Sequence, residues 1–239
     1  MIVAADYKAI EWQGAIELSG DPVGIDEWNS GVDMHQVNKD KFNLPERRIA
    51  KIFLFRLIFG GNEWSYAHDP DYSYISDSTK YWRKVIDAFK DKYHAWDRWV
   101  ADSIQEAIRK GYLVSPTGRV FYYTPVRKRG ELVWPINQIM NYRVQGTASD
   151  WVRTGRVVLK QKLDDGHCKG SLMVNSVHDS LVLDVPDNRT ECALRLLYDV
   201  VHNDTQKVFS QLFKYRFRTN IKGEVFFGPN QSDLEEWKP

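Results

Sequence analysis

The sequence predicts an α+β fold, in which a small antiparallel β-sheet accompanies a larger set of helices. Two observations lead to this prediction. Residues 79–110 repeat apolar side chains at spacings of three and four, as an amphipathic helix does. Further along, 171–177 and 180–185 are alternating apolar runs on either side of His178 and Asp179. This second pattern is typical of a β-hairpin with an acidic residue at its turn.

Composition limits the class of protein before any motif is considered. A chain of 239 residues, 43% hydrophobic and 27% charged, can bury a core and is not disordered by composition. Its net charge of +1 neither indicates nor excludes a polyanionic partner. The two cysteines are far apart, which predicts no disulfide scaffold and a reducing, cytoplasmic location. No apolar run approaches the roughly 20 residues of a membrane span, and no leader follows Met1, so we expect no membrane association.

In the first half of the chain, one strand precedes a series of helices. The apolar run at 1–6 predicts a buried strand that ends in Asp6. Helices are expected at 9–18 and 32–42. A further helix is expected between Pro45, a residue favoured in a first helical turn, and Gly60-Gly61, which end it.

In the second half, helices alternate with short strands. The segment 60–76, rich as a group in Gly, Asn, Asp, Pro and Tyr, predicts a loop, and the helix at 79–110 is expected to run unbroken to Gly111. The remaining expected elements are short strands and turns in 112–134, a helix at 137–163, a helical segment at 188–214 and a last strand at 223–227.

Two carboxylates come at the ends of predicted strands. Asp6 ends the first strand, and Asp179 lies in the hairpin turn. If the hairpin lies beside the first strand, the two side chains converge and offer the hard oxygen ligands that Mg²⁺ prefers. The plainer interpretation is that each acid merely ends a strand.

A second candidate site is one face of the helix after Pro45. Arg47, Lys51, Phe55 and Phe59 recur every four residues and therefore share a broad helix face. Two cations one turn apart at a helix start can hold a triphosphate, and the rings beyond them offer a flat surface to a base. An ordinary amphipathic helix with solvated cations explains the same pattern.

These segments, taken in order, resemble the motifs of the family A DNA polymerases, the DNA polymerase I type. DYKAIEWQ at 6–13 is similar to motif A, RRIAKIFLFRLIFGG at 47–61 to motif B, and VHDS at 177–180 to motif C. NYRVQGTASD at 141–150 resembles a further family segment. Four matches in the family's order form a far more specific signal than any one of them.

The resemblance implies a role for each matched residue. Asp6 and Asp179, helped by the Tyr7 carbonyl, would hold two Mg²⁺ ions, for which Mn²⁺ could substitute. The residues expected to bind the incoming dNTP are Glu11 as the steric gate against ribose, His35, Arg47 and Lys51 at the triphosphate, Phe55 near the sugar and base, and Phe59 at the template-base position. The residues expected to contact primer-template DNA are Arg119, Asn141, Gln145 and His178.

The resemblance also implies a domain layout. Residues 1–22 and 133–239 would form the palm of a right-handed polymerase, with its antiparallel sheet and helices, and 23–132 the helical fingers, with no thumb. We therefore expect a second chain that supplies the thumb, the N-terminal palm and an exonuclease, as in a phage-type split polymerase acting in the host cytoplasm. Phe59, where the family has Tyr, predicts weaker ribose discrimination, and Ser180 replaces a second motif C carboxylate.

Two other functions explain part of the pattern. A single-subunit RNA polymerase shares the motif logic, but Glu11 would close the space that a ribose 2′-OH needs. A non-catalytic DNA-binding or scaffold subunit could keep the fold, but it has no need of Asp6, Asp179, Arg47 and Lys51 together. Outside the motifs, the cations Arg119, Arg127, Lys128 and Arg129 suit either phosphate contacts or a solvated turn.

Overall fold

The computed structural model describes residues 1–239, and the chain divides into two compact units. The first unit consists of 1–11 and 146–239, and the second of 12–145. Both contain helices, and the only sheet of more than two strands lies in the first unit. The α+β prediction is therefore confirmed.

The first unit is built on a five-stranded sheet with the order β6-β7-β1-β8-β9. Every neighbouring pair is antiparallel. The strands are β1 (Ile2–Tyr7), β6 (Leu172–Asn175), β7 (Ser180–Asp184), β8 (Gly223–Gly228) and β9 (Glu235–Trp237). The predicted hairpin is β6–β7, and it lies directly beside the predicted N-terminal strand. The last strand, β9, lies in a segment from which no strand was predicted.

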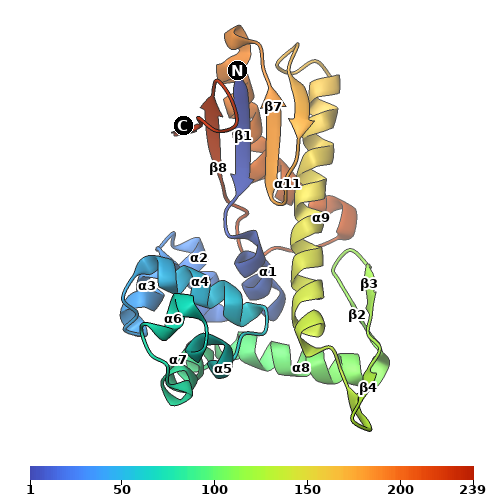
Figure 1. The fold of residues 1–239 in the computed structure, drawn as a ribbon. Coiled ribbons are helices and arrows are strands. Elements are labelled where there is room, and N and C mark those ends of the chain that lie inside the picture. The colour runs from blue at the N-terminus through green and yellow to red at the C-terminus, as the bar shows by residue number, and fades with distance from the viewer. The chain divides into compact units, whose positions relative to one another are not determined.

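Alternation along β1 buries one face of the sheet. Val3, Ala5 and Tyr7 point into the core, where they meet Leu181 of β7 and Val225 of β8. Residues of three helices complete this core, because the helices cover the same face of the sheet (Figure 1). These helices are α9 (Ile136–Asp164, whose residues up to Gln145 belong to the second unit), α10 (Thr190–Asp199) and α11 (Thr205–Phe213). The 3₁₀ turn η1 (Asp187–Arg189) precedes α10, and the π-helical turn η2 (Val200–Asp204) lies between α10 and α11.

The cysteines correct the sequence-based expectation. Cys168 and Cys192 form a disulfide with an S–S distance of 2.03 Å. The β6–β7 hairpin explains why this pairing could not be read from spacing. The chain leaves along β6 and returns along β7, which brings the segment before the hairpin next to the start of α10.

The second unit is mainly helical around a cluster of stacked aromatic rings. Phe53, Tyr66, Trp82 and Phe89 are almost completely buried, and Phe53 and Trp82 stack at 6.3 Å between ring centroids. The helices are α1 (Ile10–Ser19, whose first two residues belong to the first unit), α2 (Pro22–Asn29), α3 (Met34–Lys41), α4 (Arg47–Ile58), α5 (Glu63–Ala67), α6 (Pro70–Ser73), α7 (Thr79–Lys92) and α8 (His94–Lys110).

The helix expected at 79–110 is two helices, α7 and α8, which meet at Tyr93. The backbone of Tyr93 leaves the helical region, with φ −104° and ψ 55°. The Asp21 carboxylate, fully buried, accepts hydrogen bonds from the main-chain NH groups of Ala95 and Trp96 at 3.0 and 3.1 Å. A side chain far away in the sequence thus caps a new helix start, which no local periodicity could reveal.

The segment 60–76 is not the loop that was predicted, since it contains α5 and α6. Asn62 and Ser65 form a capping box at the start of α5, and Asp69 caps α6 just before Pro70. These are recognisable helix-start signals that the glycine content masked.

The strands expected in 112–134 form two separate hairpins. The first is β2 (Tyr112–Val114) with β3 (Val120–Tyr122), and the second is β4 (Val126–Lys128) with β5 (Glu131–Val133). Among all the helices of the chain, none has both the length and the apolar character to cross a membrane.

Candidate active site

The two predicted metal-binding acids lie on neighbouring segments of the first unit. In the β1–β7 ladder Asp6 lies opposite Ser180, the residue after Asp179. One step further along, the main-chain NH of Tyr7 donates to the Asp179 carbonyl at 3.0 Å. The structure therefore brings Asp6 and Asp179 together, as their proposed role requires.

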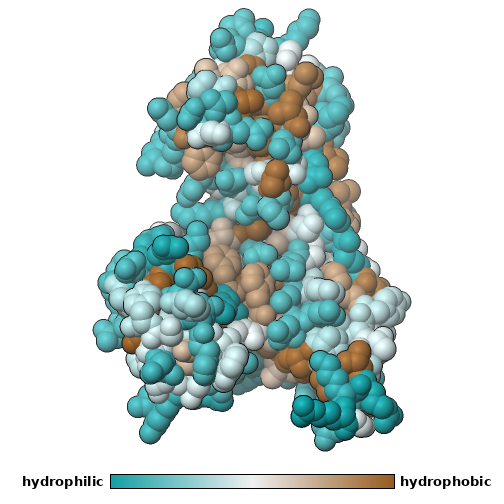
Figure 2. All heavy atoms as spheres, viewed as in Figure 1, coloured by the Kyte–Doolittle hydropathy of each residue, from teal (hydrophilic) through white to brown (hydrophobic).

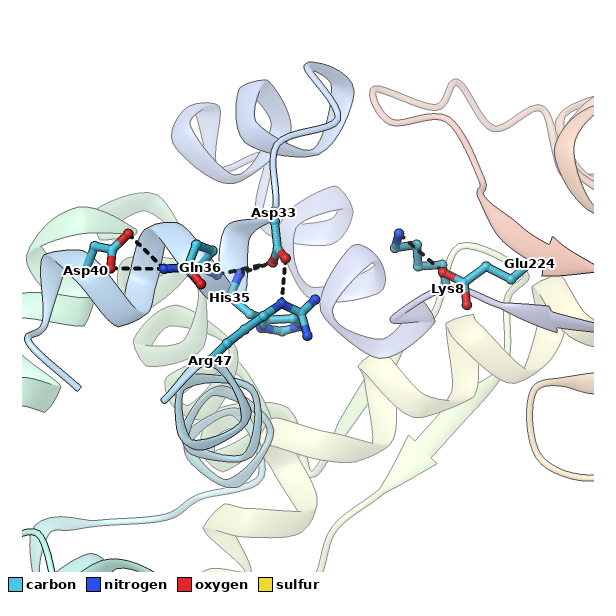
Figure 3. A network of polar contacts seen from close by, with 7 residues as sticks. All are labelled: Lys8, Asp33, His35, Gln36, Asp40, Arg47 and Glu224. Atoms are coloured by element: carbon cyan, nitrogen blue, oxygen red, sulfur yellow. Dashed lines mark hydrogen bonds and ion pairs between the residues drawn. The ribbon is translucent and has the colours of Figure 1, made fainter. Parts of the chain in front are cut away.

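A third carboxylate, which the sequence analysis missed, belongs to this cluster. Glu224 lies directly opposite Asp6 on β8, and its carboxylate pairs with Lys8 at 3.4 Å (Figure 3). Partial burial raises the pKa of Asp6, and the negative charges of Asp179 and Glu224 raise it further. Burial and the two neighbouring carboxylates thus disfavour the ionised form of Asp6. The signal was an acid near the start of the predicted strand at 223–227, which only the strand order could connect to Asp6.

Tyr7 fixes the end of β1 that carries Asp6. Its side chain is buried, and its hydroxyl lies 2.8 Å from Thr205 Oγ1. Because Thr205 Oγ1 itself donates to the Val200 carbonyl at 2.7 Å, the Tyr7 hydroxyl is the donor. Gly155 of α9 leaves room for this ring, since a Cβ there would come within 1.9 Å of the Tyr7 hydroxyl oxygen. Gly155, an unfavourable residue inside a helix, therefore has a packing reason.

Ser180, where the family motif has a carboxylate, holds the turn instead. Its Oγ donates to the Val177 carbonyl at 2.9 Å, and its main-chain NH donates to the same carbonyl at 2.8 Å. Between them His178 takes a left-handed backbone conformation with φ 52° and is exposed. Ser180 therefore shapes the turn that presents His178 and Asp179.

In the second unit, α4 carries the predicted nucleotide-binding face. Arg47 and Lys51 are exposed, whereas Phe55 and Phe59 are half-buried. Arg47 Nε donates to the Asp33 carboxylate at 2.5 Å (Figure 3). Burial is the largest single influence on the pKa of Asp33 and raises it, but the hydrogen bonds from Arg47 and the Gln36 main-chain NH, together with the charge of Arg47, lower the pKa overall. Asp33 was not among the predicted site residues, because as the N-cap of α3 it could have been recognised only as a helix start.

Two further predicted residues join this face within the second unit. The His35 ring, buried at the start of α3, lies 6.3 Å from the Phe55 ring. Asn141 on α9 donates through Nδ2 to the Phe59 carbonyl at 3.4 Å. Its buried Oδ1 accepts no hydrogen bond within the chain.

The other predicted residues lie outside these contacts. Gln145 is exposed on α9, and Arg119 is exposed just before β3. Glu11 is partly buried in the first turn of α1. Their roles, like those of the residues above, stay predictions.

The chemistry of the acidic cluster fits a divalent cation shared with a substrate. No group of three or more His, Cys, Asp or Glu side chains could hold a metal ion by itself. Mg²⁺ bound to phosphates needs only one or two protein carboxylates, because water and phosphate oxygens fill its other positions. Burial and the negative charges of Asp179 and Glu224 raise the pKa of Asp6, and a cation bound between these carboxylates would favour its ionised form.

This combination defines a class of protein: an α+β domain whose central antiparallel sheet presents paired carboxylates suited to divalent cations. Comparison with known proteins gives the class a family. The sequence model of the family described as DNA polymerase family A matches residues 1–229, and the chain belongs to that family.

Individual relatives agree with this assignment. DNA polymerase I of Bacillus subtilis is 26% identical over 85% of this chain, and the thermostable DNA polymerase I of Thermus aquaticus is 29% identical over 84%. The chain spans about a quarter of these relatives, 24% of each. The POL domain of Pol1 from M. smegmatis, solved in complex with DNA primer-template and dNTP, has the same fold, with a TM-score of 0.78 and 20% identity over 94% of this chain and 38% of that one.

Proposed function

We propose that this chain carries the catalytic part of a DNA-directed DNA polymerase, which adds dNTPs to a primer 3′-OH on a DNA template. The observation that carries the proposal is the pairing of β1 with β7, which brings Asp6 and Asp179 together in a member of DNA polymerase family A. The relative solved with primer-template and dNTP supports the choice of substrates.

Each unit contributes its own part of the reaction. Asp6 and Asp179 of the first unit would hold the divalent cations, Mg²⁺ or Mn²⁺, with the Tyr7 carbonyl as a further ligand. When bound, such ions lower the pKa of an attacking hydroxyl and stabilise the charge of the leaving pyrophosphate. On the second unit, Arg47 would bind the triphosphate through the paired N–H donors of its guanidinium and Lys51 as a point charge, near the start of α4, where the helix dipole adds positive potential.

The remaining residues select and align the substrates. Glu11 excludes the ribose 2′-OH, while Phe55 and Phe59 pack against the nucleotide and the template base. Arg119, Asn141, Gln145 and His178 contact the DNA. The unsatisfied Oδ1 of Asn141 supports the proposed DNA contact of this residue. A buried acceptor without a donor costs free energy, which a hydrogen bond from a ligand would recover.

We also propose that a second chain supplies the thumb, the remaining palm and an exonuclease. Support comes from β6, an edge strand of the sheet on which Leu172 and Val174 are 64% and 50% exposed. Apolar side chains on an unpaired edge suit a covering protein surface.

Primer extension with the 239-residue chain tests the function, alone and with the co-expressed neighbouring gene product. We expect Mg²⁺-dependent, template-directed extension that Asp6→Asn and Asp179→Asn each abolish. DNA binding without extension under every condition would favour a non-catalytic subunit. Processive extension by the chain alone would contradict the second-chain proposal.

A further inference from the structure

The β4–β5 hairpin of the second unit presents three consecutive cations to solvent. Arg127, Lys128 and Arg129 are all exposed, and 126–133 contains only one acidic residue, Glu131. Figure 2 shows hydrophilic side chains gathered where Figure 1 places the end of this hairpin. The hairpin lies outside the segments that resemble motifs A, B and C, and the proposed roles above do not use it.

The first residue of the hairpin turn is Arg129, although its left-handed backbone conformation favours asparagine. Arg129 and Gly130 both have positive φ, at 49° and 89°. A two-residue hairpin turn of this kind favours Asn-Gly, because asparagine tolerates the left-handed region better than a long side chain does. Arginine at the first position therefore weakens the turn and points to a use for its charge.

The hairpin is fixed at its base and free at its tip. Tyr123, just before it, and Trp134, just after it, pack in a small core with Ala107 of α8 and Ile139 of α9. Beyond that anchor no residue of either strand is buried. An isolated two-stranded ribbon is marginally stable in water, so a bound partner would order this one.

The chemistry of the tip suits phosphates. Arg127 Nη1 donates to the Gly130 carbonyl at 3.1 Å, which holds this guanidinium at the turn. Lys128 and Arg129 extend from the same turn, and the cross-strand partner of Lys128 is Glu131. Arginine and lysine are among the side chains that most often contact the phosphate oxygens of DNA, so three exposed cations at one turn suit the sugar-phosphate backbone.

We propose that the β4–β5 hairpin is a DNA-backbone clamp, with Arg127, Lys128 and Arg129 contacting phosphates of the primer-template. This inference rests on the proposed function, which supplies DNA as the partner. The contacts are independent of base sequence and depend on salt, because each phosphate contact releases counterions.

Fluorescence anisotropy with a labelled primer-template, measured over a series of KCl concentrations, tests the clamp. The test variant is Arg127→Gln/Lys128→Gln/Arg129→Gln. Its matched control, Lys80→Gln/Lys84→Gln/Arg98→Gln, removes the same charge from exposed positions of α7 and α8. We expect the slope of log Kobs against log[KCl] to become shallower by about 1 per lost contact in the test variant only.

A second variant, Arg129→Asn, separates binding from folding. Asparagine suits the turn, so we expect an unchanged or higher Tm together with a salt slope about 1 shallower. Equal salt slopes for the unaltered chain and the test variant would overturn the clamp and leave the polymerase proposal intact.

The remaining outcomes separate the two proposals. Loss of primer extension in Asp6→Asn with normal DNA binding supports the polymerase function whatever the hairpin does. Absence of DNA binding by the unaltered chain, both alone and with the co-expressed neighbouring gene product, contradicts both proposals. If the test variant loses affinity for an acidic polypeptide and keeps its affinity for DNA, the hairpin serves a protein partner and the clamp is wrong.

Discussion

The main-chain NH of Tyr7 donates a hydrogen bond to the main-chain carbonyl of Asp179 at 3.0 Å. This bond continues the β1–β7 ladder beyond the Asp6–Ser180 pair, so backbone pairing fixes the segments that carry both acids. A sheet is more rigid than two independent loops. The repulsion between Asp6 and Asp179 is therefore a property of the folded state that only protonation, substitution or a cation relieves.

Asp6→Asn should raise the free energy of unfolding at neutral pH while abolishing synthesis. The pKa of Asp6 is raised in the folded protein, so the folded state binds this proton more readily than the unfolded chain does. The ionised carboxylate therefore destabilises the fold above the raised pKa, and this cost disappears as pH falls toward the ordinary value of 3.8.

Urea unfolding of both proteins between pH 7 and pH 3.5 measures this difference. Asp184→Asn is the matched control, because Asp184 lies at the opposite end of β7, paired with Ile2. A variant no more stable than the parent at pH 7 would show that Asp6 is not electrostatically strained.

Gly155→Ala should destabilise the protein, although alanine is the better helix former by about 1 kcal/mol. The new methyl group would lie 1.9 Å from the Tyr7 hydroxyl oxygen and 2.7 Å from Thr205 Oγ1. Overpacking of this kind costs about 1–3 kcal/mol. Thermal unfolding of Gly155→Ala, Tyr7→Phe and the double variant measures the coupling, and we expect Tyr7→Phe to restore part of the loss. Strict additivity would show that the two residues do not press on each other.

Asp33→Asn should tighten dNTP binding about two- to fivefold, the size of an exposed ion pair. Asp33 holds Arg47 in the absence of substrate, and a triphosphate must compete with it. Asparagine keeps the helix cap, so the effect of charge is isolated. The measurement is the dNTP KM in primer extension, with Asp40→Asn of the same helix as control, since Asp40 bonds Gln36 instead. An unchanged or higher KM in Asp33→Asn alone would mean that the ion pair does not oppose binding.

Asp21→Ala should cost about 1–4 kcal/mol of stability, because one carboxylate serves two helix starts. One oxygen accepts from Gly24 in α2, and the other accepts from Ala95 and Trp96 in α8. Urea unfolding checks this value, with Asp26→Ala, an exposed acid of α2, expected to stay within about 0.5 kcal/mol of the parent. Equal effects of the two substitutions would contradict the double cap.

Local pattern was enough to predict the elements that carry the site. The apolar run before Asp6, the alternation around Asp179 and the four-residue spacing from Arg47 each express a backbone period, and each predicted element is present. Local pattern did not predict that β1 pairs with β7, since strand order depends on contacts between distant segments. The metal site implied by the resemblance to family A polymerases required this pairing, and the structure contains it.

What the sequence did not reveal depends on long-range contacts. Glu224 joins the acidic cluster because of the strand order. Asp33 at the start of α3 contacts Arg47 at the start of α4, and Cys168 bonds Cys192 on the far side of the β6–β7 hairpin. None of these pairs has a short-range signature.

Manganese binding tests the central claim most directly, because it needs neither DNA nor a second chain. Calorimetric titration of the 239-residue chain with Mn²⁺ and a non-hydrolysable dNTP analogue should detect binding that Asp6→Asn and Asp179→Asn each weaken strongly, while Asp184→Asn binds as the parent does. If both Asp6→Asn and Asp179→Asn bind Mn²⁺ as well as the parent chain, these two carboxylates are not the metal ligands and the proposed mechanism is wrong.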